Sequence, residues 1–99
     1  MGWVKDALNT LKAEGICQIR PHGGSMRGRI ESGQLVTIVQ ATGEEVVIDD
    51  VVFIKWKNNY LLHLVLDIQE EIQIGNNVGK INGWIPKQAV IGKVIKVED

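Results

Sequence analysis

The sequence predicts a mainly β fold, a small, coiled, mostly antiparallel sheet or partial barrel with one short N-terminal helix. Two observations lead to this prediction. Apolar residues recur at helical spacing near the N-terminus, and the rest of the chain consists of short apolar runs separated by turn-forming residues. Short strands joined closely by turns are typical of small sheets and barrels.

Length and composition indicate a single compact domain over residues 1–99. The 99 residues are 44% hydrophobic and 23% charged, an ordinary globular balance. The net charge of −1 gives no general attraction to nucleic acid. No apolar run approaches the about 20 residues that span a bilayer, so we expect no membrane partner. The single cysteine, Cys17, fits a reducing compartment, and the expected location is the cytoplasm.

Residues 1–15 form the helical part of this prediction. The spacing predicts an amphipathic helix over 3–14, and Gly15 is placed to end it as a left-handed cap. The stripe that would pack on the body includes Ala7, Leu8 and Leu11. A helix that binds a partner through this stripe is the alternative.

Residues 16–99 form the predicted β body. Apolar runs bounded by turn residues predict short strands over 16–20, 34–40, 46–48, 72–74 and 89–97. Residues 75–83 are rich in glycine and asparagine and are expected to form a loop. The last strand is apolar on both sides, which suggests a homodimer formed through it.

Residues 51–56 and 60–68 give the strongest β signals and predict a hairpin. Asparagine between them tolerates the left-handed backbone that hairpin turns require. A loop of all three residues, 57–59, would place Trp56 opposite Tyr60 and give one continuous apolar face. The sequence therefore predicts a three-residue loop.

In that register, His63 is the one titratable side chain among apolar neighbours in mid-strand, with Lys55 diagonal to it. Histidine titrates near neutral pH and can take and return a proton, whereas lysine serves as a base only when its pKa is lowered. A buried histidine with a purely structural role is the alternative. His22 is expected to be exposed in a loop.

Ser25 is the candidate nucleophile because it directly follows Gly23 and Gly24, which permit a tight, exposed turn. An ordinary surface loop would look the same. A serine hydroxyl becomes nucleophilic only when a base removes its proton, and His63 or Lys55 could do so. We expect no metal and no cofactor, since neither metal-ligand spacing nor a phosphate-binding glycine motif occurs.

Three segments resemble the signal-peptidase and LexA-type superfamily of serine peptidases. GGSMRGRIESGQLVTI (23–38) is similar to its nucleophile segment, and IDDVVFIKWKNNYLLHLVLDI (48–68) is similar to the hairpin that holds its general base. That base is lysine in bacterial signal peptidases and histidine in the endoplasmic-reticulum and archaeal type, and His63 stands at this position. The closing region, IGNNVGKINGWIPKQAVIGKVIKV (74–97), resembles the final blocks of the latter type.

The resemblance implies that Ser25 is the nucleophile and His63 its general base, in a peptidase whose substrate lies extended along an edge strand. The loop formed with Gly23 and Gly24 would help to hold the oxyanion through the Ser25 N–H, and Met26 would pack beneath the nucleophile. Peptides or proteins would be the substrates.

Several positions depart from the superfamily pattern. Gln34 stands where an aspartate is expected, Leu64 replaces an arginine, and Asn82 is the nearest polar substitute for a second aspartate. Asn82 and Lys55 are therefore the candidates for supporting His63. These departures motivate a second hypothesis, a catalytically inactive binding or regulatory module with the same fold.

Overall fold

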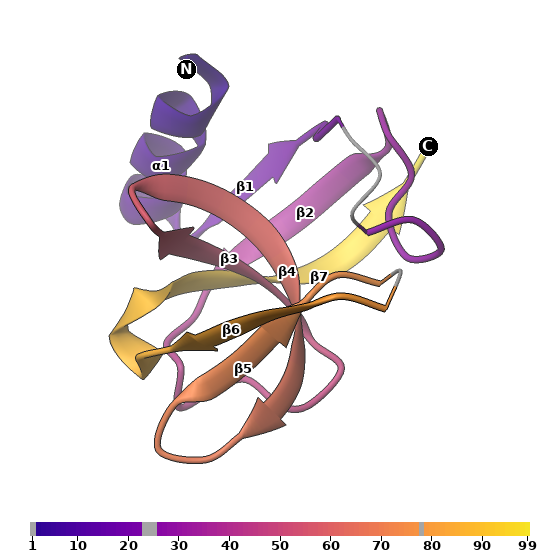
Figure 1. Ribbon diagram of the computed structural model, residues 1–99. Helices are drawn as coiled ribbons and strands as arrows, with labels where there is room; N and C mark the ends of the chain where they lie inside the picture. Colours follow the sequence, from indigo (N-terminus) through magenta and orange to yellow (C-terminus); the bar gives the residue numbers. More distant parts are fainter. Residues whose placement is uncertain (1, 23–25, 78) are drawn as a thin grey trace.

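The computed structural model describes residues 2–22, 26–77 and 79–99 (Figure 1). These residues form a helix, a short 3-10 turn and a seven-stranded antiparallel sheet in the order β1-β2-β7-β3-β4-β5-β6. The sheet curls strongly without closing into a barrel, which confirms the mainly β class. The elements are α1 (Gly2–Glu14), β1 (Ile16–Ile19), β2 (Leu35–Gln40), β3 (Val51–Trp56), β4 (Asn59–Ile68), β5 (Ile72–Gly75), β6 (Ile81–Ile85), η1 (Lys87–Ala89) and β7 (Val90–Glu98).

Helix α1 lies beside β1 at one end of the sheet, as the apolar stripe predicted (Figure 1). Ala7 and Leu11 are buried, while Leu8 is half-buried against the same core. Gly15 has a φ of +75°, and its N–H donates to the Leu11 carbonyl at 2.8 Å. The predicted left-handed cap is confirmed, and a residue with a Cβ would be strained there. The described parts of the chain contain no helix long and apolar enough to cross a bilayer.

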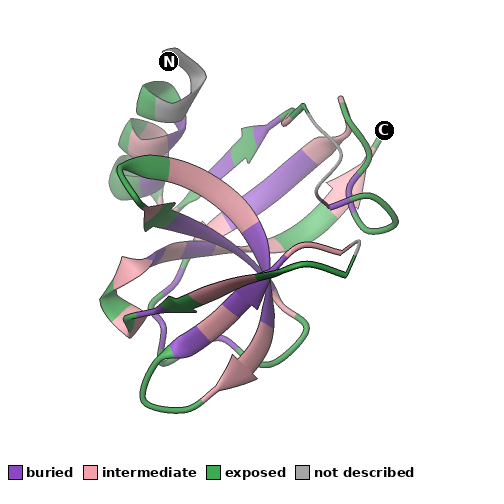
Figure 2. Cartoon of the chain, viewed as in Figure 1, coloured by how far each residue is buried: buried purple, intermediate pink, exposed green. Residues whose placement is uncertain are grey.

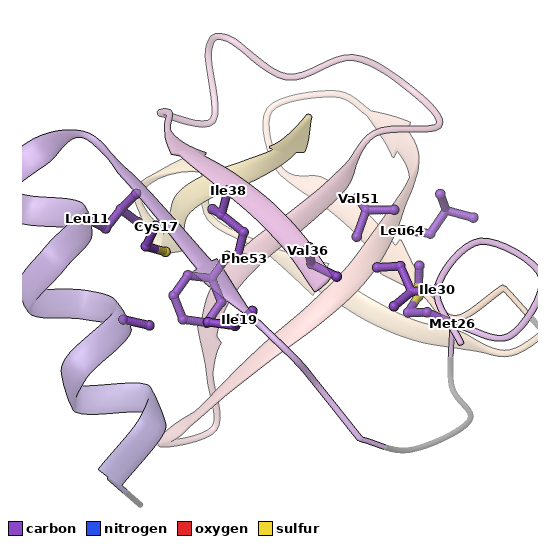
Figure 3. Packing of buried hydrophobic residues seen from close by; sticks show 11 residues of the cluster. Leu11, Cys17, Ile19, Met26, Ile30, Val36, Ile38, Val51, Phe53 and Leu64 are labelled. Carbon is purple, nitrogen blue, oxygen red and sulfur yellow. The ribbon is translucent and has the colours of Figure 1, made fainter. Parts of the chain in front are cut away.

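The curl of the sheet separates two apolar clusters, to which successive residues of β3 and β4 contribute alternately. Figure 2 shows that the buried residues lie mainly along the strands. The helix-side cluster extends from α1 to the turn after Ser25 (Figure 3); its buried members are Ala7, Leu11, Cys17, Ile19, Met26, Ile30, Val36, Ile38, Val51, Phe53 and Leu64. The isoleucine cluster comprises Val46, Val52, Ile54, Val65, Ile72, Ile74, Ile85 and Val90.

The three-residue loop predicted for the β3–β4 hairpin is wrong. Trp56 pairs with Asn59, so Lys57 and Asn58 alone form the loop, with φ values of 49° and 64°. Positive φ at both loop residues is typical of a type I′ turn, which matches the right-handed twist of the strands. The prediction required one apolar face and one mixed face. Both faces of the hairpin are largely buried, so either register places apolar side chains in a core. The distribution of apolar residues therefore does not select the register.

Two other segments also differ from expectation. Residues 46–48 form no strand, because the Val47 N–H donates to Asp50 Oδ2 at 2.9 Å and the Asp50 N–H donates back to the Val47 carbonyl. Part of the expected loop 75–83 instead belongs to the edge strand β6. Asn82 is the extra residue of a bulge there, between the pairs Ile74–Gly83 and Gly75–Ile81. Pairing with β5 therefore overrides the low β propensity of asparagine and glycine.

Candidate active site

Ser25, Gly23 and Gly24 lie outside the described residues, but both flanks of this segment are placed. At its base, the Gly33 N–H donates to the Pro21 carbonyl at 2.9 Å. Arg20 Nη1 donates to the Gly33 carbonyl at 2.8 Å. These bonds join the chain before this segment, at Arg20 and Pro21, to Gly33, which lies beyond the turn that follows it.

The residues after Ser25 form a turn over 26–31. The Ile30 N–H donates to the Met26 carbonyl at 2.8 Å, and the Gly28 N–H donates to Glu31 Oε2 at 2.7 Å. Met26 and Ile30 are buried together with Leu64 at one end of the helix-side cluster (Figure 3). The side chain that follows the predicted nucleophile therefore fixes this turn to the core.

His63 lies on β4 opposite Val52 and is only 7% exposed. Its Nδ1 is 2.6 Å from the Leu62 carbonyl oxygen. Because a carbonyl can only accept, Nδ1 carries the hydrogen, and the neutral ring keeps its lone pair on Nε2. The ring of Trp56 contacts His63 edge-on, with 6.4 Å between ring centroids.

Burial lowers the pKa of His63 from its ordinary value of 6.5. The hydrogen bond to Leu62 opposes this shift, whereas the positive charge of Lys80 adds to it. The lowered pKa favours neutral imidazole at neutral pH, the form that can accept a proton as a general base.

The structure does not bring Lys55 to His63. Lys55 pairs with Tyr60, whereas His63 pairs with Val52, so the two side chains leave the hairpin on opposite faces. The Lys55 Nζ instead lies 5.9 Å from the centroid of the Tyr60 ring. The diagonal contact expected between Lys55 and His63 depended on the incorrect register.

Asn82 precedes Gly83, the position on β6 that approaches Trp56, and its Oδ1 forms no hydrogen bond to Trp56 or His63. A Cβ on the adjacent Gly83 would lie 3.6 Å from Trp56 Cζ2. The Asn82 Oδ1 is buried and has no hydrogen-bond partner. A buried acceptor without a donor is unfavourable. Asn82 is therefore one residue from a contact with Trp56, and its side-chain oxygen is unsatisfied.

Two polar arrangements were missed by sequence reasoning. His22 Nδ1 lies 3.3 Å from Ser32 Oγ in an exposed pair. Arg29 bonds to both Asp49 and Asn77, which come from distant loops. The sequence carries no periodic or motif signal for either, since the tertiary structure alone brings these residues together.

Within the described parts of the chain, no three histidine, cysteine, aspartate or glutamate side chains gather into a metal-binding group. In comparisons with known proteins, the chain matches no protein-family model and no curated protein.

Proposed function

We propose that the protein is a serine-peptidase-like enzyme that hydrolyses peptide bonds through Ser25 and His63. The observation that best supports this is the state of His63. It is buried and its pKa is lowered, while the Leu62 carbonyl orients its ring through Nδ1. Nε2 is thereby left as the proton acceptor that an otherwise unreactive serine hydroxyl needs.

The loop between β5 and β6 also supports the pairing of Ser25 with His63. Asn77, in the loop between β5 and β6, donates to the Arg27 carbonyl at 2.8 Å, two residues beyond Ser25. The same loop follows Gly75, which pairs with Leu64, the neighbour of His63. This loop therefore contacts the turn that follows the nucleophile and continues directly from the end of β5 that pairs with the strand of the base.

In the proposed reaction, Ser25 Oγ attacks the substrate carbonyl carbon while His63 Nε2 takes the hydroxyl proton. Backbone N–H groups of the loop would hold the oxyanion of the tetrahedral intermediate. The imidazolium then protonates the leaving amine as the C–N bond breaks. A water molecule, deprotonated by the same nitrogen, then attacks the acyl carbon, and the imidazolium returns the proton to Ser25 Oγ as the ester C–O bond breaks and the acid product leaves.

The chain contains two serines and two histidines, so each proposed residue has a matched control. Wild type, Ser25→Ala and His63→Gln are incubated with a peptide library, and the products are followed by mass spectrometry. Ser32→Ala and His22→Gln are the controls. They also show whether the exposed His22–Ser32 pair, rather than Ser25 and His63, carries the cleavage. We expect cleavage to be lost in the first two variants and retained in the controls. Equal cleavage by wild type and Ser25→Ala would overturn the proposal.

A non-catalytic binding module is the second candidate, and edge strand β6 favours it. Ile81 and Trp84 expose 61% and 41% of their surfaces on this strand. An unpaired edge with apolar side chains can bind an extended peptide by strand addition, whether or not the peptide is then cleaved. In this case, Ser25→Ala retains partner binding in a pull-down, whereas Ile81→Lys loses it. Loss of both binding and hydrolysis in Ser25→Ala would count against the module.

A homodimer through β7 stays a prediction. Ile95 on this strand is 55% exposed, which leaves an apolar side chain for a second copy to cover. Light scattering of wild type and Ile95→Lys tests it, and a monomeric wild type would exclude it.

A further inference from the structure

Arg29 connects the 26–31 turn to two loops that are distant in sequence. Its Nε donates to Asn77 Oδ1 at 2.8 Å, and its Nη1 donates to the Asp49 carbonyl at 3.0 Å. A third contact, from Nη2 to Asp49 Oδ1, is 3.4 Å long. The ion pair itself is weak because the Asp49 side chain is 74% exposed. The specificity of the arrangement lies in the fork of directional bonds, which a guanidinium can form and an ammonium cannot.

Asn77 binds the same turn at two points. It accepts from Arg29 and donates through Nδ2 to the Arg27 carbonyl at 2.8 Å, so the orientation of its amide is defined by both bonds. Gly28, between these two arginines, has a φ of +96°, and a Cβ there would lie 2.8 Å from Asn77 Nδ2. The turn and the amide therefore fit closely.

Both loops that Arg29 contacts are attached to β4 immediately after His63. The Asp49 N–H donates to the Val65 carbonyl at 2.9 Å. Gly75, where the other loop begins, pairs with Leu64. Asp49 itself has a φ of +79°, unusual for a residue other than glycine. This conformation aims its carbonyl at the Arg29 guanidinium while its N–H remains bonded to β4.

We infer that Arg29 is a positioning residue for the proposed peptidase site, acting through Asn77 and Asp49. The inference rests on the proposed function. The buried side chains of Met26 and Ile30 also hold the turn, but apolar contacts are non-directional and allow sliding. The Arg29 bonds set the orientation of the turn that follows Ser25 relative to the two loops attached to β4, the strand that carries His63. A displacement of the reacting group by about 1 Å can lower the rate about 100-fold.

The kinetic test compares Arg29→Gln with Arg27→Gln. Both remove one positive charge from the same turn, but the guanidinium of Arg27 makes no hydrogen bond or ion pair to the rest of the described chain. On a peptide that the wild type cleaves, we expect kcat to fall about 100-fold in Arg29→Gln with KM changed less than about threefold. Arg27→Gln should stay within about twofold of wild type. Equal kcat in wild type and Arg29→Gln overturns the inference.

Two further variants separate positioning from a general loss of structure. Arg29→Lys keeps the charge but lacks the fork, so we expect kcat between wild type and Arg29→Gln. Asn77→Ala removes the other half of the arrangement and should reproduce the low kcat of Arg29→Gln. Thermal unfolding of each variant is measured alongside. A loss of activity that matches the unfolded fraction at the assay temperature contradicts a positioning role.

A second measurement does not depend on catalysis. A nitroxide is attached to Ser25→Cys in a Cys17→Ala background, and its enhancement of nuclear relaxation is measured at the His63 ring and the β4 amides. Adding Arg29→Gln should change these enhancements severalfold, whereas adding Arg27→Gln should leave them unchanged. Identical enhancements with and without Arg29 overturn the inference. If the wild type cleaves no peptide while Arg29→Gln alters the enhancements, the peptidase proposal fails but the positioning by Arg29 stands.

Discussion

The helix-side cluster and the isoleucine cluster share β3 and β4 but are enclosed in different ways. Helix α1 and the turn containing Met26 cover the first, which includes Phe53, the single phenylalanine of the chain. Strands β5 and β6 fold round the second, which consists of valine and isoleucine with Trp56 packed against it. His63 lies on the face of β4 that contributes to the second cluster.

This difference bears directly on the proposed site. The turn after Ser25 is attached to one cluster through Met26, whereas His63 belongs to the face of the other. The two clusters meet on β4, where Leu64 belongs to the first cluster and its neighbour His63 faces the second. The Arg29 bonds add directional polar contacts between the turn and the two loops attached to β4.

The largest expected effect is loss of the Phe53 ring from the helix-side cluster. Phe53 is fully buried and its ring centroid lies 6.0 Å from that of Tyr60. Phe53→Ala should lower the free energy of unfolding by about 3–5 kcal/mol, measured by denaturant titration. Ile74→Ala in the isoleucine cluster should cost about 2–5 kcal/mol, and Phe53→Leu less than either. If Phe53→Leu proves as destabilising as Phe53→Ala, the ring is not filling a closed core.

Two glycines test whether the clusters tolerate added volume. A Cβ on Gly75 would meet the Lys80 carbonyl and the Leu66 side chain. A Cβ on Gly92 would lie 2.7 Å from the Val39 carbonyl and 2.8 Å from Ile38 Cγ2. Because backbone atoms cannot move aside cheaply, Gly75→Ala and Gly92→Ala should each lower the free energy of unfolding by about 1–3 kcal/mol. A neutral effect at either glycine would show that its neighbours can rearrange.

The pH dependence of stability should report the burial of His63. Its pKa is lowered on folding, so the unfolded chain binds more protons as the pH falls below 6.5. The contribution of neutral His63 to the free energy of unfolding is complete above pH 6.5. It is lost as the pH falls from there toward the lower pKa of the folded state. Unfolding midpoints between pH 7.5 and 5 should decrease in wild type and vary less in His63→Gln. His22→Gln, the control, should follow the wild type; an unchanged slope in His63→Gln would contradict the prediction.

The smallest expected effect is at Asn82. Asn82→Ala removes a buried acceptor that has no partner in the described chain, which is favourable, but also removes the packing of the amide, which is unfavourable. Because these effects oppose each other, we expect a net change within about 0.5 kcal/mol. Thr37 is the contrasting buried polar residue, since its Oγ1 accepts from Gln18 at 3.1 Å. Thr37→Val should cost about 1 kcal/mol in the same denaturant titration. A larger loss for Asn82→Ala than for Thr37→Val would mean that Asn82 has a partner in solution.

The sequence by itself determined the elements whose signals are local. Helix α1 and its Gly15 cap follow from periodicity and one glycine, and β1, β2, β3, β4, β5 and β7 follow from short apolar runs. The burial of His63 in mid-strand was also predictable, because its neighbours along the chain are apolar.

Only the tertiary structure decided the register of the hairpin, the place of β6 and the contacts of Arg29. The register could not be derived from which residues face the core, because β3 is buried on both sides. Strand β6 forms because its backbone pairs with that of β5. Arg29, Asp49 and Asn77 leave no pattern in the sequence, since contacts between distant loops depend on how the sheet curls. Local preferences are encoded residue by residue, whereas such contacts are a property of the whole fold.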